Sequence, residues 1–196
     1  MLLSAAIGAL VTAAVSTVGD YLWANALPHG IPIYWFAHGA LLFFTVGCCL
    51  GLPSQKPLVG GAGGVAIGLA ATAGYALMRP ALGYTGIFVM FFALWIGLGL
   101  LVGRVLQRRD KTSVVLMRSV LAAIGSGCGF YAISGIWFPF NPHGWDYAKH
   151  FLYWTLAYFP GFARAAAVPV AAADRLGRQA RRGTAFRPSL TRAGTP

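Results

Sequence analysis

The sequence predicts an all-α protein, a polytopic transmembrane helical bundle of about six spans with both termini on the cytoplasmic side. Hydrophobic residues make up 58% of the 196 residues and charged residues only 10%, and the mean hydropathy is +0.68. A soluble domain needs a more polar surface than this composition provides. The apolar residues also gather into runs of about 20 residues, the length that an α-helix needs to cross a bilayer.

The first three spans are predicted at residues 2–26, 33–52 and 58–78. The first run lacks the positively charged start of a cleavable secretion signal and is long enough to span, so we interpret it as a retained helix. Prolines and a short turn separate these three runs. Arg79 and Pro80 are expected to end the third helix, since proline interrupts helical hydrogen bonding.

The last three spans are predicted at residues 83–106, 113–138 and 141–163. A charged loop divides the fourth span from the fifth. Asn141 is expected to cap the sixth helix, with Pro142 at its first helical position. An asparagine side chain accepts hydrogen bonds from the free N–H groups at a helix start, and proline has no N–H to leave unpaired there.

Positive charge is distributed unevenly along the chain, which has a formal net charge of +11. Nearly all Lys and Arg fall on one side of a six-span arrangement, in the tail and in a loop with Arg104, Arg108, Arg109 and Lys111. Short basic loops stay in the cytoplasm, where anionic headgroups bind them. We therefore expect a bacterial cytoplasmic (inner) membrane protein, with a transmembrane domain at 1–163 and a basic interfacial or disordered tail at 164–196. The tail has no recognised reader motif, so nucleic acid is not an expected partner.

Glycines recur four residues apart in three of the predicted spans. These rows are Gly60, Gly64 and Gly68, then Gly99 and Gly103, then Gly125 and Gly129. Small residues at this spacing let two helix backbones approach closely inside a membrane. We expect each row to be a contact surface between helices.

The ionisable residues outside the basic segments gather near one membrane face. Of the four acidic residues, Asp20 lies inside the first apolar run and Asp146 lies near the start of the sixth span. The four histidines fall in the same neighbourhoods, at His29, His38, His143 and His150. The predicted topology places all six residues on the extracytoplasmic side. An ionisable group at membrane depth is costly and therefore indicates a functional site.

Three of these side chains lie deeper than the others. At 1.5 Å of rise per residue, Asp20, His38 and His150 fall about 9 to 12 Å from the nearest proline at a helix end. Because they come from three helices at similar depth, we predict that they form one site. Spacings of three and four residues also place His143 and Asp146 on the same helical face as His150. The residues expected to orient the site by hydrogen bonding are Asp146, His143 and His29.

Several kinds of chemistry suit such a set. Two histidines and one aspartate with open positions form a known ligand set for iron, so a transition metal is one candidate. Histidine and aspartate within a bundle can also relay protons. A haem between His38 and His150 is a third candidate, although the chain has no C-x-x-C-H motif for covalent attachment. The structural alternative is that Asp20 and His38 form an interhelical hydrogen bond.

Arg79 and Lys149 are predicted on the same extracytoplasmic side. They are candidates for contact with an anionic substrate or a lipid headgroup. The alternative is that their long side chains extend from helix ends toward water.

Three functional hypotheses follow from these features. The leading one is a multi-pass membrane protein that binds or translocates a metal ion, a proton or a small ligand. The second is a non-catalytic subunit that anchors or assembles a larger membrane complex with other membrane subunits, for which glycine rows and a basic tail suffice. The third is a membrane-embedded metalloenzyme or haem-binding redox subunit, which needs an open coordination position.

Overall fold

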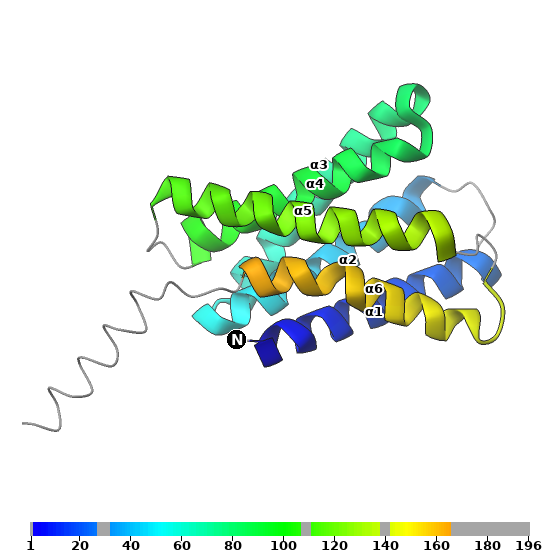
Figure 1. Ribbon diagram of the computed structural model, residues 1–196, viewed down its shortest axis with the longest axis horizontal. Helices are drawn as coiled ribbons and strands as arrows, with labels where there is room; N and C mark the ends of the chain where they lie inside the picture. Colours follow the sequence, from blue (N-terminus) through cyan, green and yellow to red (C-terminus); the bar gives the residue numbers. More distant parts are fainter. Residues whose placement is uncertain (1, 27–31, 107–110, 138–141, 166–196) are drawn as a thin grey trace, which may run out of the picture.

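The computed structural model describes residues 2–26, 32–106, 111–137 and 142–165, and helices are the only regular elements within them (Figure 1). An all-α fold is thus confirmed for this part of the chain. Two short 3₁₀ helices lie at Leu52–Ser54 and Gly83–Thr85. The main elements are α1 (Leu2–Asn25), α2 (Pro32–Gly51), α3 (Pro57–Leu82), α4 (Gly86–Leu100), the π-helical stretch Leu101–Leu106, α5 (Thr112–Trp137) and α6 (Asp146–Ala165).

Five of the described helices are long and apolar enough to cross a membrane. These candidate spans are Leu2–Asn25, Phe36–Ser54, Pro57–Leu82, Phe88–Leu106 and Thr112–Tyr131. They indicate an integral membrane protein, as the composition predicts. Helix α6 is less apolar, because polar and charged side chains such as Asp146, Lys149 and His150 occupy its first turns.

The helices run alternately up and down, so their ends gather at two ends of the bundle (Figure 1). At one end, called here the amino-terminal end, α1 begins, α2 passes into α3, α5 begins and α6 finishes. At the other end, called here the site end, α1 finishes, α2 begins, α3 passes into α4 and α6 begins. Helix α1 lies beside α6 and α2, α5 lies beside α4 and α6, and α2 lies beside α3.

The glycine rows lie at helix contacts, as predicted. A Cβ added to Gly60 would come within 2.2 Å of the Gly47 carbonyl oxygen, and one added to Gly64 within 2.1 Å of the Phe43 carbonyl oxygen. The backbones of α2 and α3 therefore touch along this row. A Cβ on Gly99 would meet Ser119 Oγ at 2.0 Å, so α4 also packs closely against α5 at this glycine.

Helix α3 does not end at Arg79 and Pro80, so that prediction is wrong. The helix continues through Pro80 to Leu82, where Gly83 adopts a φ of +55° and its N–H bonds to the Arg79 carbonyl. A proline in the last turn removes only one helical hydrogen bond near an end that already has free carbonyls. The left-handed glycine closes the helix instead.

Helix α6 begins later than the sequence suggested. Pro142 precedes the helix, and Asn141 lies outside the described residues. A turn in which Gly144 has a φ of +52° leads into Asp146, whose Oδ2 accepts a hydrogen bond from the His143 N–H at 3.2 Å. The predicted start at 141 and 142 is therefore wrong, because the helix begins at Asp146 after this turn. The helix then continues through Pro160 to Ala165.

Candidate functional site

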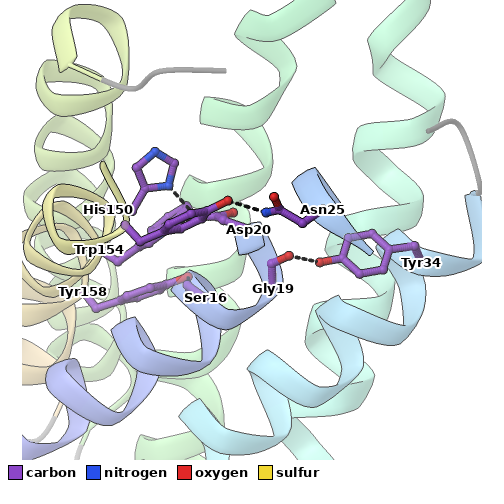
Figure 2. A network of polar contacts seen from close by, with 9 residues as sticks. Ser16, Gly19, Asp20, Asn25, Tyr34, His150, Trp154 and Tyr158 are labelled. Carbon is purple, nitrogen blue, oxygen red and sulfur yellow. Dashed lines mark hydrogen bonds and ion pairs between the residues drawn. The ribbon is translucent and has the colours of Figure 1, made fainter. Parts of the chain in front are cut away.

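Asp20 joins α1 to α6 near the site end (Figure 2). Its Oδ2 atom lies 2.9 Å from His150 Nδ1 and accepts a hydrogen bond from Trp154 Nε1 at 2.8 Å. The His150 side chain is only 1% exposed, whereas that of Asp20 is 25% exposed. The partly exposed carboxylate thus contacts a fully buried imidazole.

Helical periodicity explains why these residues meet. Ser16 and Asp20 are four residues apart on α1, and His150, Trp154 and Tyr158 are spaced by four on α6, so each set lines one helix face. The two helices run in opposite directions, and their faces meet in order. Ser16 Oγ lies 3.5 Å from the Tyr158 hydroxyl, one turn further into the bundle than Asp20.

The contact between α1 and α6 continues to the site end. Asn25 Nδ2 donates to the Tyr147 hydroxyl at 2.6 Å and to the Tyr21 carbonyl at 2.9 Å. The rings of Tyr21 and Tyr147 meet edge to face at 5.3 Å, and Tyr147 lies 6.2 Å from the His150 ring. These residues cover the outer side of His150.

Aromatic rings from α4 and α5 hold the α6 face in place. Phe130 stacks on Trp154 at 5.3 Å, Trp154 stacks on Tyr158 at 5.6 Å, and Phe91 stacks on Phe130 at 5.0 Å. A ring enclosed in such a stack has little freedom to turn. The stack therefore keeps the Trp154 N–H directed at Asp20.

His38 reaches the same turn of α1 as His150 does, but from α2. Its ring lies against Gly19, where an added Cβ would come within 2.0 Å of His38 Cε1. Tyr34 stacks on His38 at 5.6 Å with an interplanar angle of 6°, and its hydroxyl donates to the Gly19 carbonyl. The two imidazoles thus contact adjacent residues of α1, His38 at Gly19 and His150 at Asp20.

The residues expected to surround the site are placed differently. Asp146 accepts hydrogen bonds from Lys149 Nζ at 2.9 Å and from the His143 N–H at 3.2 Å. His143 is exposed and precedes α6, so it does not share a helical face with His150. The structure therefore gives Asp146 and His150 separate partners. His29 lies outside the described residues.

Arg79 and Lys149 lie on different helices. Arg79 is exposed in the last turn of α3, whereas Lys149 is exposed in the first turns of α6 and is paired with Asp146. Both lie toward the site end, because α3 ends there and α6 begins there.

The positions of the side chains that could act as metal ligands are relevant to the metal and haem hypotheses. Within the part of the chain that the structure describes, no group of three His, Cys, Asp or Glu side chains is placed to hold a metal ion. An iron porphyrin with two axial histidines needs the two rings on its opposite faces. His38 and His150 instead each pack against α1.

Three residues of this network were missed by the sequence analysis: Ser16, Trp154 and Tyr158. Their signal was the interval of four residues, which relates Ser16 to Asp20 and relates both aromatic residues to His150. Their depth along the helices alone could not distinguish these three residues from the other residues of the apolar runs.

No protein-family model, no curated protein and no solved structure matches this chain. The function must therefore be inferred from the site itself.

Proposed function

We propose that this chain is a six-span protein of the bacterial inner membrane, with both termini cytoplasmic, whose Asp20–His150 pair binds a proton and passes it on. The observation that carries the proposal is the hydrogen bond between Asp20 Oδ2 and the buried His150 Nδ1 at 2.9 Å. A carboxylate and an imidazole in contact are both able to hold a proton.

A sixth crossing by α6 is supported by its contact with α1. A Cβ on Gly8 would meet Phe162 at 2.9 Å, and at the other end of both helices Asn25 bonds Tyr147. Helix α6 thus accompanies α1 over most of its length. Its 20 residues correspond to about 30 Å at the helical rise, the thickness of the hydrocarbon core. The polar side chains His150 and Tyr158 are buried within the bundle and so avoid lipid.

The charge state of the pair supplies a driving force for proton binding. With Asp20 ionised and His150 neutral, the site carries one net negative charge at membrane depth, which is unfavourable. Uptake of a proton by either group leaves the pair without net charge. The partial exposure of Asp20 gives that proton a route from the site end.

A proton suits this site better than the other candidates do. Transition-metal binding needs at least three well-placed protein ligands, whereas the Asp20 carboxylate is already engaged by His150 and Trp154. The assembly-subunit alternative loses part of its support, because the glycine rows are occupied by helices of the same chain. The small size of the chain and its basic segments still support the assembly-subunit alternative.

The proposal is tested by proton flux into vesicles. The purified protein is reconstituted in liposomes that enclose a pH-sensitive dye, and a potassium gradient with valinomycin drives proton entry. Wild type should exceed protein-free vesicles, and Asp20→Asn and His150→Gln should abolish this excess. Asp146→Asn and His143→Gln are matched controls, since they change the same residue types near the same end. His143 is exposed, and the Asp146 carboxylate is paired with Lys149 instead of a histidine.

Two results would overturn the proposal. One is a wild-type flux equal to that of protein-free vesicles, and the other is an Asp20→Asn flux equal to that of wild type. Thermal unfolding of each variant in detergent shows whether a lost flux reflects a lost fold.

A further inference from the structure

Several buried polar atoms lie deeper in the bundle than Asp20. Thr12, Trp95 and Ser126 are fully buried, on α1, α4 and α5 respectively. Within the described residues, Thr12 Oγ1, Trp95 Nε1 and Ser126 Oγ have no hydrogen-bond partner. Leaving one such group unpaired in a protein interior costs about 1 to 3 kcal/mol. Buried polar atoms without protein partners are the usual ligands of internal water.

The first of these atoms continues the α1 face that carries the site. Thr12 precedes Ser16 by four residues, as Ser16 precedes Asp20, so the three side chains form one row. Ser16 Oγ is 3.5 Å from the Tyr158 hydroxyl, a long separation compared with about 2.7 to 2.8 Å for an ordinary O–H···O bond. The Tyr158 hydroxyl is therefore able to bind a water molecule as well.

Trp95 approaches the same residue from α4. Its ring centroid is 6.5 Å from that of Tyr158. A Cβ added to Gly161 would meet Trp95 Cε2, the carbon bonded to Nε1, at 2.5 Å. Trp95 Cζ2 and Cη2 would lie closer still, at 2.2 and 2.3 Å, so the absence of a side chain at Gly161 lets the indole ring pack directly against α6.

The register of α4 and α5 brings Ser126 to the level of Trp95. Gly99 lies against Ser119, and Phe91 stacks on Phe130, which fixes how the two helices align. Trp95 is midway between Gly99 and Phe91, and Ser126 lies between Ser119 and Phe130 on α5. Both residues face the bundle interior, since both are fully buried.

We propose that ordered water molecules occupy the interior beside Tyr158, held by Thr12, Trp95 and Ser126, and that they conduct protons between Asp20–His150 and the amino-terminal end. The conduction part rests on the proposed function; the hydration part does not. Each water accepts a proton on an oxygen lone pair and releases another from its O–H bond, so no atom or charge accumulates along the row. The ligand class of this second site is water, or the hydronium formed from it.

The hydration part is tested by a structure at about 2 Å resolution, in which ordered waters should lie within about 3 Å of Trp95 Nε1 and Ser126 Oγ. Exchange of the Trp95 indole proton with deuterated solvent gives an independent measure, and Trp95→Phe identifies its nuclear magnetic resonance signal. A dry interior, with these side chains bonded to backbone carbonyls, would overturn the hydration part.

The conduction part is tested by proton flux in Ser126→Ala and Thr12→Val. Each should reduce the flux about threefold to tenfold, because each removes one hydrogen bond to a conducting water. Ser119→Ala and Thr155→Val are matched controls, since Ser119 Oγ donates to the Val115 carbonyl and Thr155 Oγ1 to the Phe151 carbonyl, both at 2.8 Å. The controls should conduct as wild type does.

The outcomes separate this inference from the proposed function. If Asp20→Asn abolishes flux while Ser126→Ala and Thr12→Val conduct as wild type does, the interior conduction route is refuted and the Asp20–His150 proton site stands. If ordered waters are observed but wild type conducts no protons, the proposed function fails and only the hydration part survives.

Discussion

The ring of His38 occupies the space that a side chain at residue 19 would need. It is held between Gly19 and the stacked ring of Tyr34, whose hydroxyl also bonds the Gly19 carbonyl. The ring therefore has little room to move aside. This single position sets how closely α2 approaches the turn of α1 that carries Asp20.

Gly19→Ala should therefore destabilise the protein. The added Cβ would lie 2.0 Å from His38 Cε1, and relieving such an overlap should cost about 1 to 3 kcal/mol of unfolding free energy. Thermal unfolding in detergent, followed by circular dichroism, measures the loss. Gly74→Ala is the control, because nothing lies within 4 Å of its added Cβ.

The double variant Gly19→Ala with His38→Ala should recover stability relative to Gly19→Ala alone, since the ring that causes the overlap is gone. Equal stability of Gly19→Ala and Gly74→Ala would contradict the close contact. The sequence predicted that His38 and Asp20 lie at similar depth, but not that glycine makes their approach possible.

At the scale of the elements, α2 and α3 meet backbone to backbone. Gly47 of α2 and Gly60 of α3 each face the other's carbonyl, and a Cβ on either would come within about 2 Å of it. A backbone carbonyl cannot turn aside as a side chain can. The glycine row in α3 thus fixes the α2–α3 pair.

Gly60→Ala should separate these two helices and lower the unfolding free energy by about 3 kcal/mol, at the upper end of the usual overpacking range. Thermal unfolding is again the measurement. Gly129→Ala serves as its control, because the nearest atoms to that Cβ are 3.8 Å away. If Gly60→Ala and Gly129→Ala unfold at the same temperature, the backbones of α2 and α3 are not in close contact at Gly60.

At the scale of the whole molecule, charge differs between the two ends of the bundle. Among the described residues, five basic side chains lie at or near the amino-terminal end: Lys56, Arg104, Lys111, Arg118 and Arg164. At the site end lie Arg79 and Lys149, and Lys149 is paired with Asp146. This asymmetry favours cytoplasmic placement of the amino-terminal end.

Accessible cysteines test this topology. Gln55→Cys, Lys111→Cys and Arg164→Cys should react with an impermeant maleimide only from the cytoplasmic side of membrane vesicles. Thr85→Cys and His143→Cys should react only from the opposite side. All five positions are exposed, so each reports the location of a helix end.

The labelling requires a background without Cys48, Cys49 and Cys128, and detergent-solubilised samples confirm that every introduced cysteine can react. Labelling of His143→Cys and Arg164→Cys from one side would show that α6 does not cross the membrane. The five-span alternative would then replace the six-span proposal.

The membrane class, the helical fold and the approximate helix positions followed from the sequence alone. These properties depend on local apolar content, and a run of about 20 apolar residues has few alternatives to a spanning helix. The errors fell at helix ends. Pro80 was tolerated in a last turn, and the turn at Gly144 replaced the expected cap, because the local chain had competing ways to satisfy the same backbone groups.

Which polar side chains share a partner was decided only by the tertiary structure. Similar depth along the helices placed Asp20, His38 and His150 in one region. The rotation of the helices about their axes decides the contacts: Asp20 bonds to His150 and Trp154, whereas His38 packs against Gly19. Depth follows from position along one helix, whereas partnership depends on the rotation and register of two helices. Those are set by contacts between residues far apart in the chain, such as the glycine rows and the aromatic stack, which no local pattern specifies.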